Sequence, residues 1–225
     1  MVWFINQVML KPVIAIDGPA ASGKGTLARK LAQKMNYAHL DTGAIYRIAA
    51  LYLVQHNLEL TLENGIRAAR HIQENLDLAS LQNPALRTDE IGSLTSKLSA
   101  LPEIRSILLD TQRHFAQNPP DGFDGAVLDG RDIGTVVCPE ADLKLYVTAN
   151  VEARAQRRLK ELHSRGLEAD YEHVLQDMKD RDFRDMNREI APLKPAQDSV
   201  LIDTTNLGPE EALQKVLVMV KSQLP

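Results

Sequence analysis

Short apolar runs alternate with longer amphipathic segments along most of the chain. The first run, residues 13–16, has no polar position, which is typical of a strand buried on both faces of a parallel sheet. Similar runs at residues 37–40, 126–129, 143–148 and 199–204 predict four more strands. Five strands separated by helical segments predict an α/β fold, with one parallel sheet and helices on both faces.

The amphipathic segments have the spacing of helices. In the first, Leu27, Leu31 and Met35 share one face, and basic residues occupy the other. The predicted helices are residues 25–35, 44–56, 65–73, 88–101, 102–116, 151–189 with a break at 164–167, and 213–221. Residues 57–116 contain no run that predicts a strand, and we expect residues 57–101 to form a flap over the sheet.

The composition narrows the class of protein. The 225 residues, 44% hydrophobic and 25% charged, suit one domain rather than two. A net charge of -4 and an aromatic content of 4% argue against a nucleic-acid partner, which needs basic and stacking side chains. No apolar run approaches the ~20 residues that span a bilayer, and the apolar residues 1–12 lack the features of a signal peptide. A single cysteine, Cys138, fits a reducing cytoplasm, where we expect the protein to be.

The sequence GPAASGKGT, residues 18–26, separates the first predicted strand from the first helix. Gly18 and Gly23 permit a turn whose N–H groups point inward, and the following helix adds positive charge at its N-terminus. Lys24 supplies an ammonium for the β- and γ-phosphates of a nucleotide, and Thr26 a hydroxyl for Mg²⁺ or phosphate. These features predict a phosphate-binding loop; the alternative is a glycine-rich turn without a ligand.

A second motif, DGRDIGT, begins at Asp129, where the third predicted strand ends. Ligands of open α/β sheets bind at the carboxyl ends of the strands, so this carboxylate is placed to hold the water shell of a metal ion. Arg131 follows directly and offers a forked donor for a phosphate. The alternative is a turn that contains an internal Asp–Arg pair.

Arginines recur at helical spacing in residues 151–194. Arg154, Arg157 and Arg158 share one helix face, and a second set follows at the same spacing. Its members are Arg181, Arg184, Asp185 and Arg188. A phosphoryl-transfer site needs several arginines together, often on a lid that excludes water, and we expect such a lid at residues 155–190. The alternative is a solvated, salt-bridged helical hairpin.

Together these motifs resemble bacterial cytidylate kinases, a family of nucleoside monophosphate kinases with a phosphate loop. The resemblance rests on GPAASGKGT, LDTGAIYR, DGRDIGTVV and RDFRDMNREIAPL, in the same order and spacing, and covers residues 13–204. Gly-Lys-Gly-Thr is the loop form of these kinases, which accounts for Gly25 in the place of the usual Ser or Thr. The resemblance implies transfer of the γ-phosphoryl group of ATP to CMP or dCMP, with Mg²⁺.

The resemblance also implies roles for residues around ATP. Lys24 would bridge the donor phosphates, Arg157 and Arg158 would belong to the lid, and Thr26 and Asp129 would hold Mg²⁺ directly or through water. The implied ATP-binding residues are Gly18, Pro19, Ala20, Ala21, Ser22, Gly23, Lys24, Gly25, Thr26 and Arg157. The implied catalytic residues are Lys24, Asp129, Arg131, Arg158 and Arg181.

For the acceptor nucleotide, the resemblance implies that Asp132 reads the edge of cytosine, that Ser96 and Arg105 line the base pocket, and that the remaining residues hold ribose and phosphate. The full implied set is Thr42, Arg47, Ser96, Arg105, Arg131, Asp132, Arg181, Asp185 and Arg188. One departure lies at residues 76–88, which are too short for the β-rich insertion that family members often carry.

Other functions remain open from the sequence. A kinase of the same fold could act on AMP, UMP or a non-nucleotide acceptor, and a nucleotide sensor would bind ATP without transferring phosphate. A sensor is expected to lack the acceptor-side arginines, whereas Arg47, Arg131 and Arg188 are present. We expect a monomeric, single-domain kinase with its core at residues 13–56, 102–150 and 195–225, and small-molecule partners only.

Overall fold

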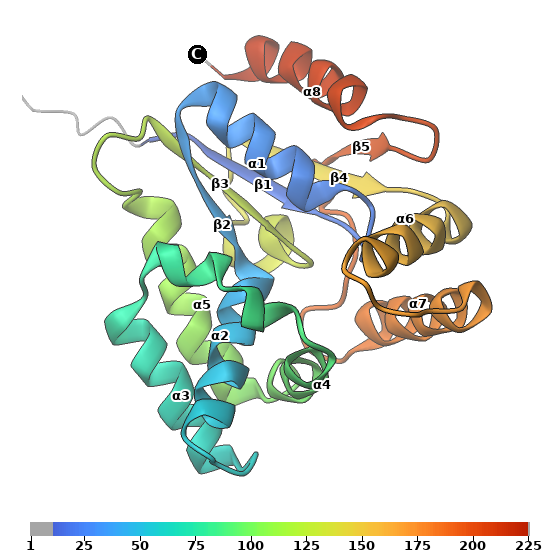
Figure 1. Cartoon of the computed structure of the whole chain (residues 1–225). Coiled ribbons are helices and arrows are strands. Elements are labelled where there is room, and N and C mark those ends of the chain that lie inside the picture. Colours follow the sequence, from blue (N-terminus) through green and yellow to red (C-terminus); the bar gives the residue numbers. More distant parts are fainter. Residues whose placement is uncertain (1–10, 225) are drawn as a thin grey trace, which may run out of the picture.

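The sheet has five parallel strands in the order β2-β3-β1-β4-β5, which confirms the predicted α/β fold (Figure 1). The structure is a computed structural model that describes residues 11–224; most of the apolar N-terminal segment, residues 1–10, lies outside them. The strands are β1 Val13–Asp17, β2 Tyr37–Asp41, β3 Gly125–Gly130, β4 Leu143–Thr148 and β5 Val200–Asp203.

The central strand explains the unbroken apolar pattern at the start of the chain. β1 pairs with β3 on one side and β4 on the other, and Ile14, Ala15 and Ile16 are fully buried. Parallel pairing places Asp17 beside Gly130, and Asp41 beside Asp129. The polar residues that end three strands therefore meet at one edge of the sheet, where ligands of such folds bind.

Helices cover both faces of this sheet. The long helices are α1 Lys24–Met35, α2 Thr42–Gln55, α3 Leu62–Asn75, α4 Asp89–Leu98, α5 Pro102–Gln117, α6 Val151–Ser164, α7 Tyr171–Asn187 and α8 Pro209–Gln223. Side-chain caps explain where several of them begin, because Asp41, Thr61 and Asp170 each accept a backbone N–H from the first turn.

The two faces of the sheet have separate cores. Leu27 and Leu31 of α1 pack with Val216 of α8 on one face, and Figure 1 shows these two helices together above the strands. On the other face, α2 and α5 join α3 and α4 in one apolar cluster, in which Ile72 and Leu98 are buried. The predicted flap, residues 57–101, thus packs as an extension of this core.

Helices α6 and α7 form a hairpin at the carboxyl ends of β1 and β4 (Figure 1). Ala155, Val174 and Met178 make its small core, against which Ala20 and Ala21 of the phosphate loop pack. This confirms the predicted break, because α6 ends at Ser164 and α7 begins at Tyr171. The hairpin therefore lies directly over the loop.

Several elements differ from the prediction. α3 extends three residues N-terminal to the predicted start at residue 65, because Thr61 caps it, and α8 begins at Pro209 rather than at residue 213. Short 3₁₀ helices, η1 Leu78–Gln82 and η2 Pro84–Arg87, and a π-helical turn, η3 Ile133–Val137, were not predicted. The π turn depends on the Asp17 carboxylate, which accepts the N–H groups of Ile133 and Gly134, both at 2.7 Å. Contacts so distant in sequence leave no periodic signal.

Candidate active site

The loop at residues 18–26 has a shape that only glycine permits at two positions. A Cβ on Gly18 would lie 1.9 Å from the carbonyl oxygen of Val147, and Gly23 has φ +88°. Gly23 also begins α1 without a side-chain cap, so the first N–H groups of the helix remain available to an anion. Thr204, directly after β5, donates its hydroxyl to the carbonyl of Ser22 at 2.8 Å and anchors the loop.

Lys24 follows this turn and lies among both signs of charge. Burial and, to a smaller extent, the charge of Arg131 lower the pKa of Lys24 to about 8, whereas the charges of Asp129 and Asp41 act in the opposite direction. An anion bound in the loop would favour the protonated ammonium. The geometry therefore couples anion binding at the loop to the charge of Lys24.

This coupling predicts weaker ATP binding at alkaline pH. With a pKa of about 8 in the free protein, Lys24 is mostly charged at neutral pH, and bound phosphates would keep it charged. The affinity of a non-hydrolysable ATP analogue, measured by calorimetry, is expected to fall roughly eightfold between about pH 7.5 and about pH 9. Lys24→Arg, which stays charged over this range, should flatten the slope; an equal slope in both proteins would contradict the coupling.

Two carboxylates lie beside Lys24 at the ends of β2 and β3. Asp129 is buried, and its Oδ2 lies 2.8 Å from Nε2 of His39. Burial and the neighbouring charge of Asp129 raise the pKa of Asp41. A Cβ at Gly25 would be 3.7 Å from Oδ1 of Asp129, so the first turn of α1 packs directly on this carboxylate.

These oxygens suit a hard cation such as Mg²⁺, which prefers carboxylates, phosphates and water. Asp129 presents Oδ1 toward the phosphate loop, and Thr26 lies exposed on the first turn of α1. Within residues 11–224 no three His, Cys, Asp or Glu side chains are grouped as a complete ligand set. A cation here would thus need further ligands from substrate phosphates and water.

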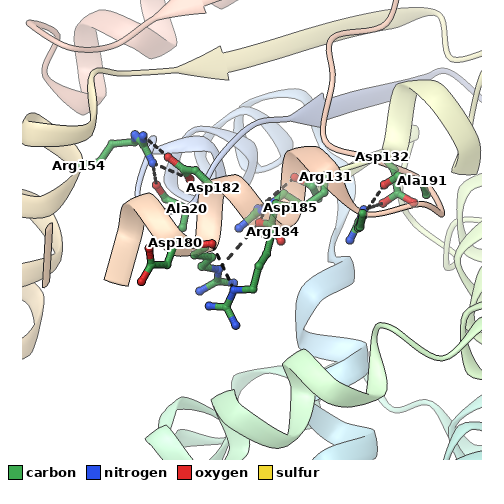
Figure 2. A network of polar contacts seen from close by, with 12 residues as sticks. Ala20, Arg131, Asp132, Arg154, Asp180, Asp182, Arg184, Asp185 and Ala191 are labelled. Atoms are coloured by element: carbon green, nitrogen blue, oxygen red, sulfur yellow. Dashed lines mark hydrogen bonds and ion pairs between the residues drawn. The ribbon is translucent and has the colours of Figure 1, made fainter. Parts of the chain in front are cut away.

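Arg131 connects β3 to α7. Its Nε donates to Oδ2 of Asp185 at 2.9 Å (Figure 2). Nε of Arg181 lies 4.0 Å from the same oxygen. Burial acts to raise the pKa of Asp185, but the charges of Arg131 and Arg181 outweigh it and lower the pKa. The fold therefore brings together residues from the second motif and from the arginine-rich helix.

A second polar group surrounds Asp132. Nη2 of Arg105 donates to Oδ2 of Asp132 at 2.5 Å, and its guanidinium lies 5.9 Å from the centre of the Tyr46 ring. Nη2 of Arg188 lies 3.6 Å from Oδ1, an ion-pair distance, and has no hydrogen-bond partner among the described residues. A buried donor of this kind is placed to serve a ligand.

Arg47 points from α2 toward η2. Its Nη1 donates to the carbonyl of Leu86 at 2.7 Å, while Arg165, between α6 and α7, donates to the next carbonyl, that of Arg87, at 2.8 Å. Thr42 lies deeper, and its hydroxyl donates to the backbone oxygen of Asp129 at 2.9 Å. The short η2 segment thus connects α2 to the helical hairpin.

The three arginines of α6 lie within one regular helix at the spacing of a shared face, but each has a different partner. Arg154 is buried and donates twice to Asp182, at 3.1 and 2.5 Å, and once to Ala20 at 3.3 Å (Figure 2). Arg157 donates to Oγ1 of Thr204 at 3.1 Å, and Arg158 pairs with Glu161. The helical spacing sets the direction in which each side chain leaves α6, whereas the partners around the helix determine what each guanidinium binds. The interpretation as a salt-bridged hairpin and the interpretation as a lid are compatible, since the α6–α7 hairpin has internal ion pairs and also contacts the phosphate loop.

Among the hydrogen bonds of the described residues, none joins the Ser96 side chain to another residue of the implied set. Ser96 is exposed on α4, and its backbone carbonyl accepts the hydroxyl of Ser99. Ser99 instead contacts the Asp132 group, because its carbonyl accepts Nη1 of Arg105 at 3.3 Å. The role implied for Ser96 stays a prediction.

The sequence reasoning missed His39 and Asp17, which both contact the site. His39 lies two residues before Asp41 in a short strand, and Asp17 directly precedes the phosphate loop. Asp17 ends β1, which was the available signal for it, whereas His39 lies in the middle of β2 and gave no such signal.

Comparisons with known proteins identify the family of the chain. The family model described as cytidylate kinase matches residues 14–222. A cytidylate kinase of Paramagnetospirillum magneticum is 51% identical over 215 residues, which are 95% of this chain and 100% of that protein. One of Rhodospirillum rubrum is 50% identical and covers 91% of this chain and 95% of its own.

A solved structure supports the fold alone. The crystal structure of an uncharacterized protein from Eubacterium ventriosum superposes with a TM-score of 0.56 at 15% identity, covering 94% of this chain and 99% of that one. The family match spans the phosphate loop, the motif at Asp129 and the arginines of α7, which lie together in space. The chain therefore belongs to the cytidylate kinase family.

Proposed function

We propose that this protein transfers the γ-phosphoryl group of ATP to CMP or dCMP, giving ADP and CDP or dCDP, with Mg²⁺. The observation that carries the proposal is the meeting of two cationic groups at one sheet edge. Lys24, Arg131 and Arg181 lie close together, because the charges of the two arginines lower the pKa of Lys24 and the charge of Arg131 also lowers the pKa of Arg181. Arg105 and Arg188 face Asp132 nearby.

The residues divide into a donor side and an acceptor side. On the donor side, the loop at residues 18–26 holds the phosphates of ATP, with Lys24 between donor and acceptor, and Arg157 and Arg158 approach from α6. Asp132 with Arg105 recognises cytosine, and Asp185 with Arg188 holds the ribose side. Thr42, Arg47, Arg131 and Arg181 surround the acceptor phosphate, and Ser96 closes the base pocket from α4.

The chemistry requires positioning and charge, and no strong base. A phosphate oxygen of CMP is already a nucleophile, and the transferred group passes through a loose, in-line transition state with charge on its equatorial oxygens. Fixed guanidinium and ammonium groups stabilise this charge without reorganising. Mg²⁺, for which Thr26 and Asp129 offer oxygen ligands directly or through water, would neutralise charge on the β- and γ-phosphates.

We further propose a core at residues 13–56, 102–150 and 195–225, an acceptor flap at 57–101 and a lid at 155–190. None of the helices in residues 11–224 combines the length and apolarity needed to cross a membrane. We propose that the protein acts in the cytoplasm as a monomer.

A panel of acceptors tests the proposed function. CMP and dCMP are expected to give ADP in a coupled assay at rates at least about tenfold above AMP, because cytosine alone would satisfy the Asp132 group. UMP is the most informative comparison among the acceptors, because its base differs from cytosine at the group that would hydrogen-bond a carboxylate. A faster rate with AMP, or with an acceptor that is not a nucleotide, would favour the rival kinase, and binding of ATP without any transfer would favour a sensor.

A further inference from the structure

His39 has no part in the function described so far, yet its ring reaches the central carboxylate of the site. It lies on β2, in which Tyr37, His39 and Asp41 share one face of the strand because they are two residues apart. Tyr37 belongs to the core that α1 and α8 form on that face of the sheet. Nε2 of His39 lies 2.8 Å from Oδ2 of Asp129, which is the adjacent strand's residue paired with Asp41. The imidazole therefore approaches Asp129 from the side of β2.

The other oxygen of Asp129 lies near the first turn of α1. Oδ1 lies 3.7 Å from the position that a Cβ of Gly25 would occupy, one residue after Lys24. One carboxylate is thus held between a ring nitrogen on one side and the first turn of α1 on the other. An ionised carboxylate only accepts hydrogen bonds, so Nε2 carries the proton of this contact.

This carboxylate needs a fixed orientation. The terminal torsion of Asp is broad, so the carboxylate would rotate readily without a directional partner. Asp41 is a close neighbour of the same sign, since the charge of Asp129 contributes to the raised pKa of Asp41. A carboxylate free to rotate could turn toward the Lys24 ammonium and compete there with the phosphates of ATP.

We propose that His39 is a positioning residue, which donates Nε2–H to Oδ2 of Asp129 and thereby keeps Oδ1 directed at the phosphate loop and its cation. The inference rests on the proposed role of Asp129 toward Mg²⁺. Partners that orient a ligating group from behind typically change metal affinity or activity by about 10–100-fold when removed. His39 itself touches neither substrate nor metal in this arrangement.

Three substitutions separate the hydrogen bond from simple packing. His39→Gln keeps an N–H donor at about the reach of Nε2, His39→Leu fills similar space without a donor, and His39→Asn is polar but too short. His173→Leu is the matched control, because it removes a His–Asp pair of 3.1 Å from the surface of α7. Thermal unfolding of each variant reports any structural damage.

The decisive measurement is metal binding rather than turnover. Mn²⁺, a spectroscopic substitute for Mg²⁺, is titrated by electron paramagnetic resonance into the full-length protein saturated with a non-hydrolysable ATP analogue. The Leu and Asn variants are expected to bind Mn²⁺ at least about tenfold more weakly, with the Gln variant and the His173→Leu control within about threefold of the wild type. If the Leu variant does not fold, the comparison of Asn with Gln carries the same information.

Two results would overturn the inference: wild-type metal affinity in the Leu and Asn variants, or an equal loss in all three, Gln included. Neither depends on the acceptor, since CMP is absent from the titration. Failure of the proposed kinase activity would appear separately, as a wild-type protein that binds metal and ATP analogue normally but does not phosphorylate CMP or dCMP.

Discussion

Lys24→Ala is expected to lower kcat at least about 10²–10³-fold while the protein remains folded. Lys24 is the one lysine of the phosphate loop, and it lies close to the charges of Arg131, Asp129 and Asp41. Removing it would leave the charge that develops on the transferred phosphoryl group without its mobile cation. The loss should be larger in kcat than in the affinity for ATP, because the loop N–H groups still bind phosphates.

A coupled assay for ADP at saturating CMP measures this change. Lys34→Ala, which removes an exposed lysine from the same helix, is the matched control and should retain the wild-type rate. Denaturant unfolding of both variants should give midpoints close to the wild type. A nearly normal kcat in Lys24→Ala would disprove the assignment of residues 18–26 as the phosphate loop of a kinase.

Asp132→Ala is expected to raise the KM for CMP about 100-fold and to change the KM for ATP by less than about threefold. A site that hydrogen-bonds a polar edge loses most when that partner is absent, since buried groups are left unpaired. The structure adds a second cause, because Asp132 also pairs with Arg105 and lies 3.6 Å from Arg188. Without the carboxylate these guanidinium groups would repel each other and leave their positions.

Asp132→Asn separates the two causes, since it keeps the shape and one acceptor oxygen. It should impair CMP less than Asp132→Ala if the arginines need only an acceptor, and equally if they need the charge. Asp180→Ala, which removes an exposed carboxylate from α7, is the control and should leave both constants unchanged. An equal loss for CMP and ATP would exclude a specific role of Asp132 toward the base.

The chemistry of the site could be predicted because its motifs are local. The residues of GPAASGKGT are sufficient to predict a phosphate-binding loop, since the glycine positions and the lysine are typical of such a loop between a buried strand and a helix. Its structure confirms the reason for both glycines, one set by the close carbonyl of Val147 and the other by a positive φ. The motif that begins at Asp129 could be predicted for the same reason, because the apolar pattern already predicted a strand that ends at this residue.

The contacts between motifs were not predictable in the same way. The spacing of Arg154, Arg157 and Arg158 indicated a common face, but the structure gives them partners on α7, after β5 and on α6 itself. Ser96 was implied by resemblance, yet its neighbour Ser99 is the one that meets Arg105. Such details depend on rotamers and on which elements pack nearby, neither of which has a sequence period.

By itself the sequence determined the class of fold, the phosphate loop and the set of charged residues. These follow from local backbone preference and from the burial that each strand and helix requires, which are properties of neighbouring residues. Only the tertiary structure decided which charges oppose one another: Arg131 with Asp185, Asp132 with Arg105, and His39 with Asp129. Those pairs join residues from 27 to 90 positions apart, so the packing of the sheet and the hairpin had to bring them together before any of them could act.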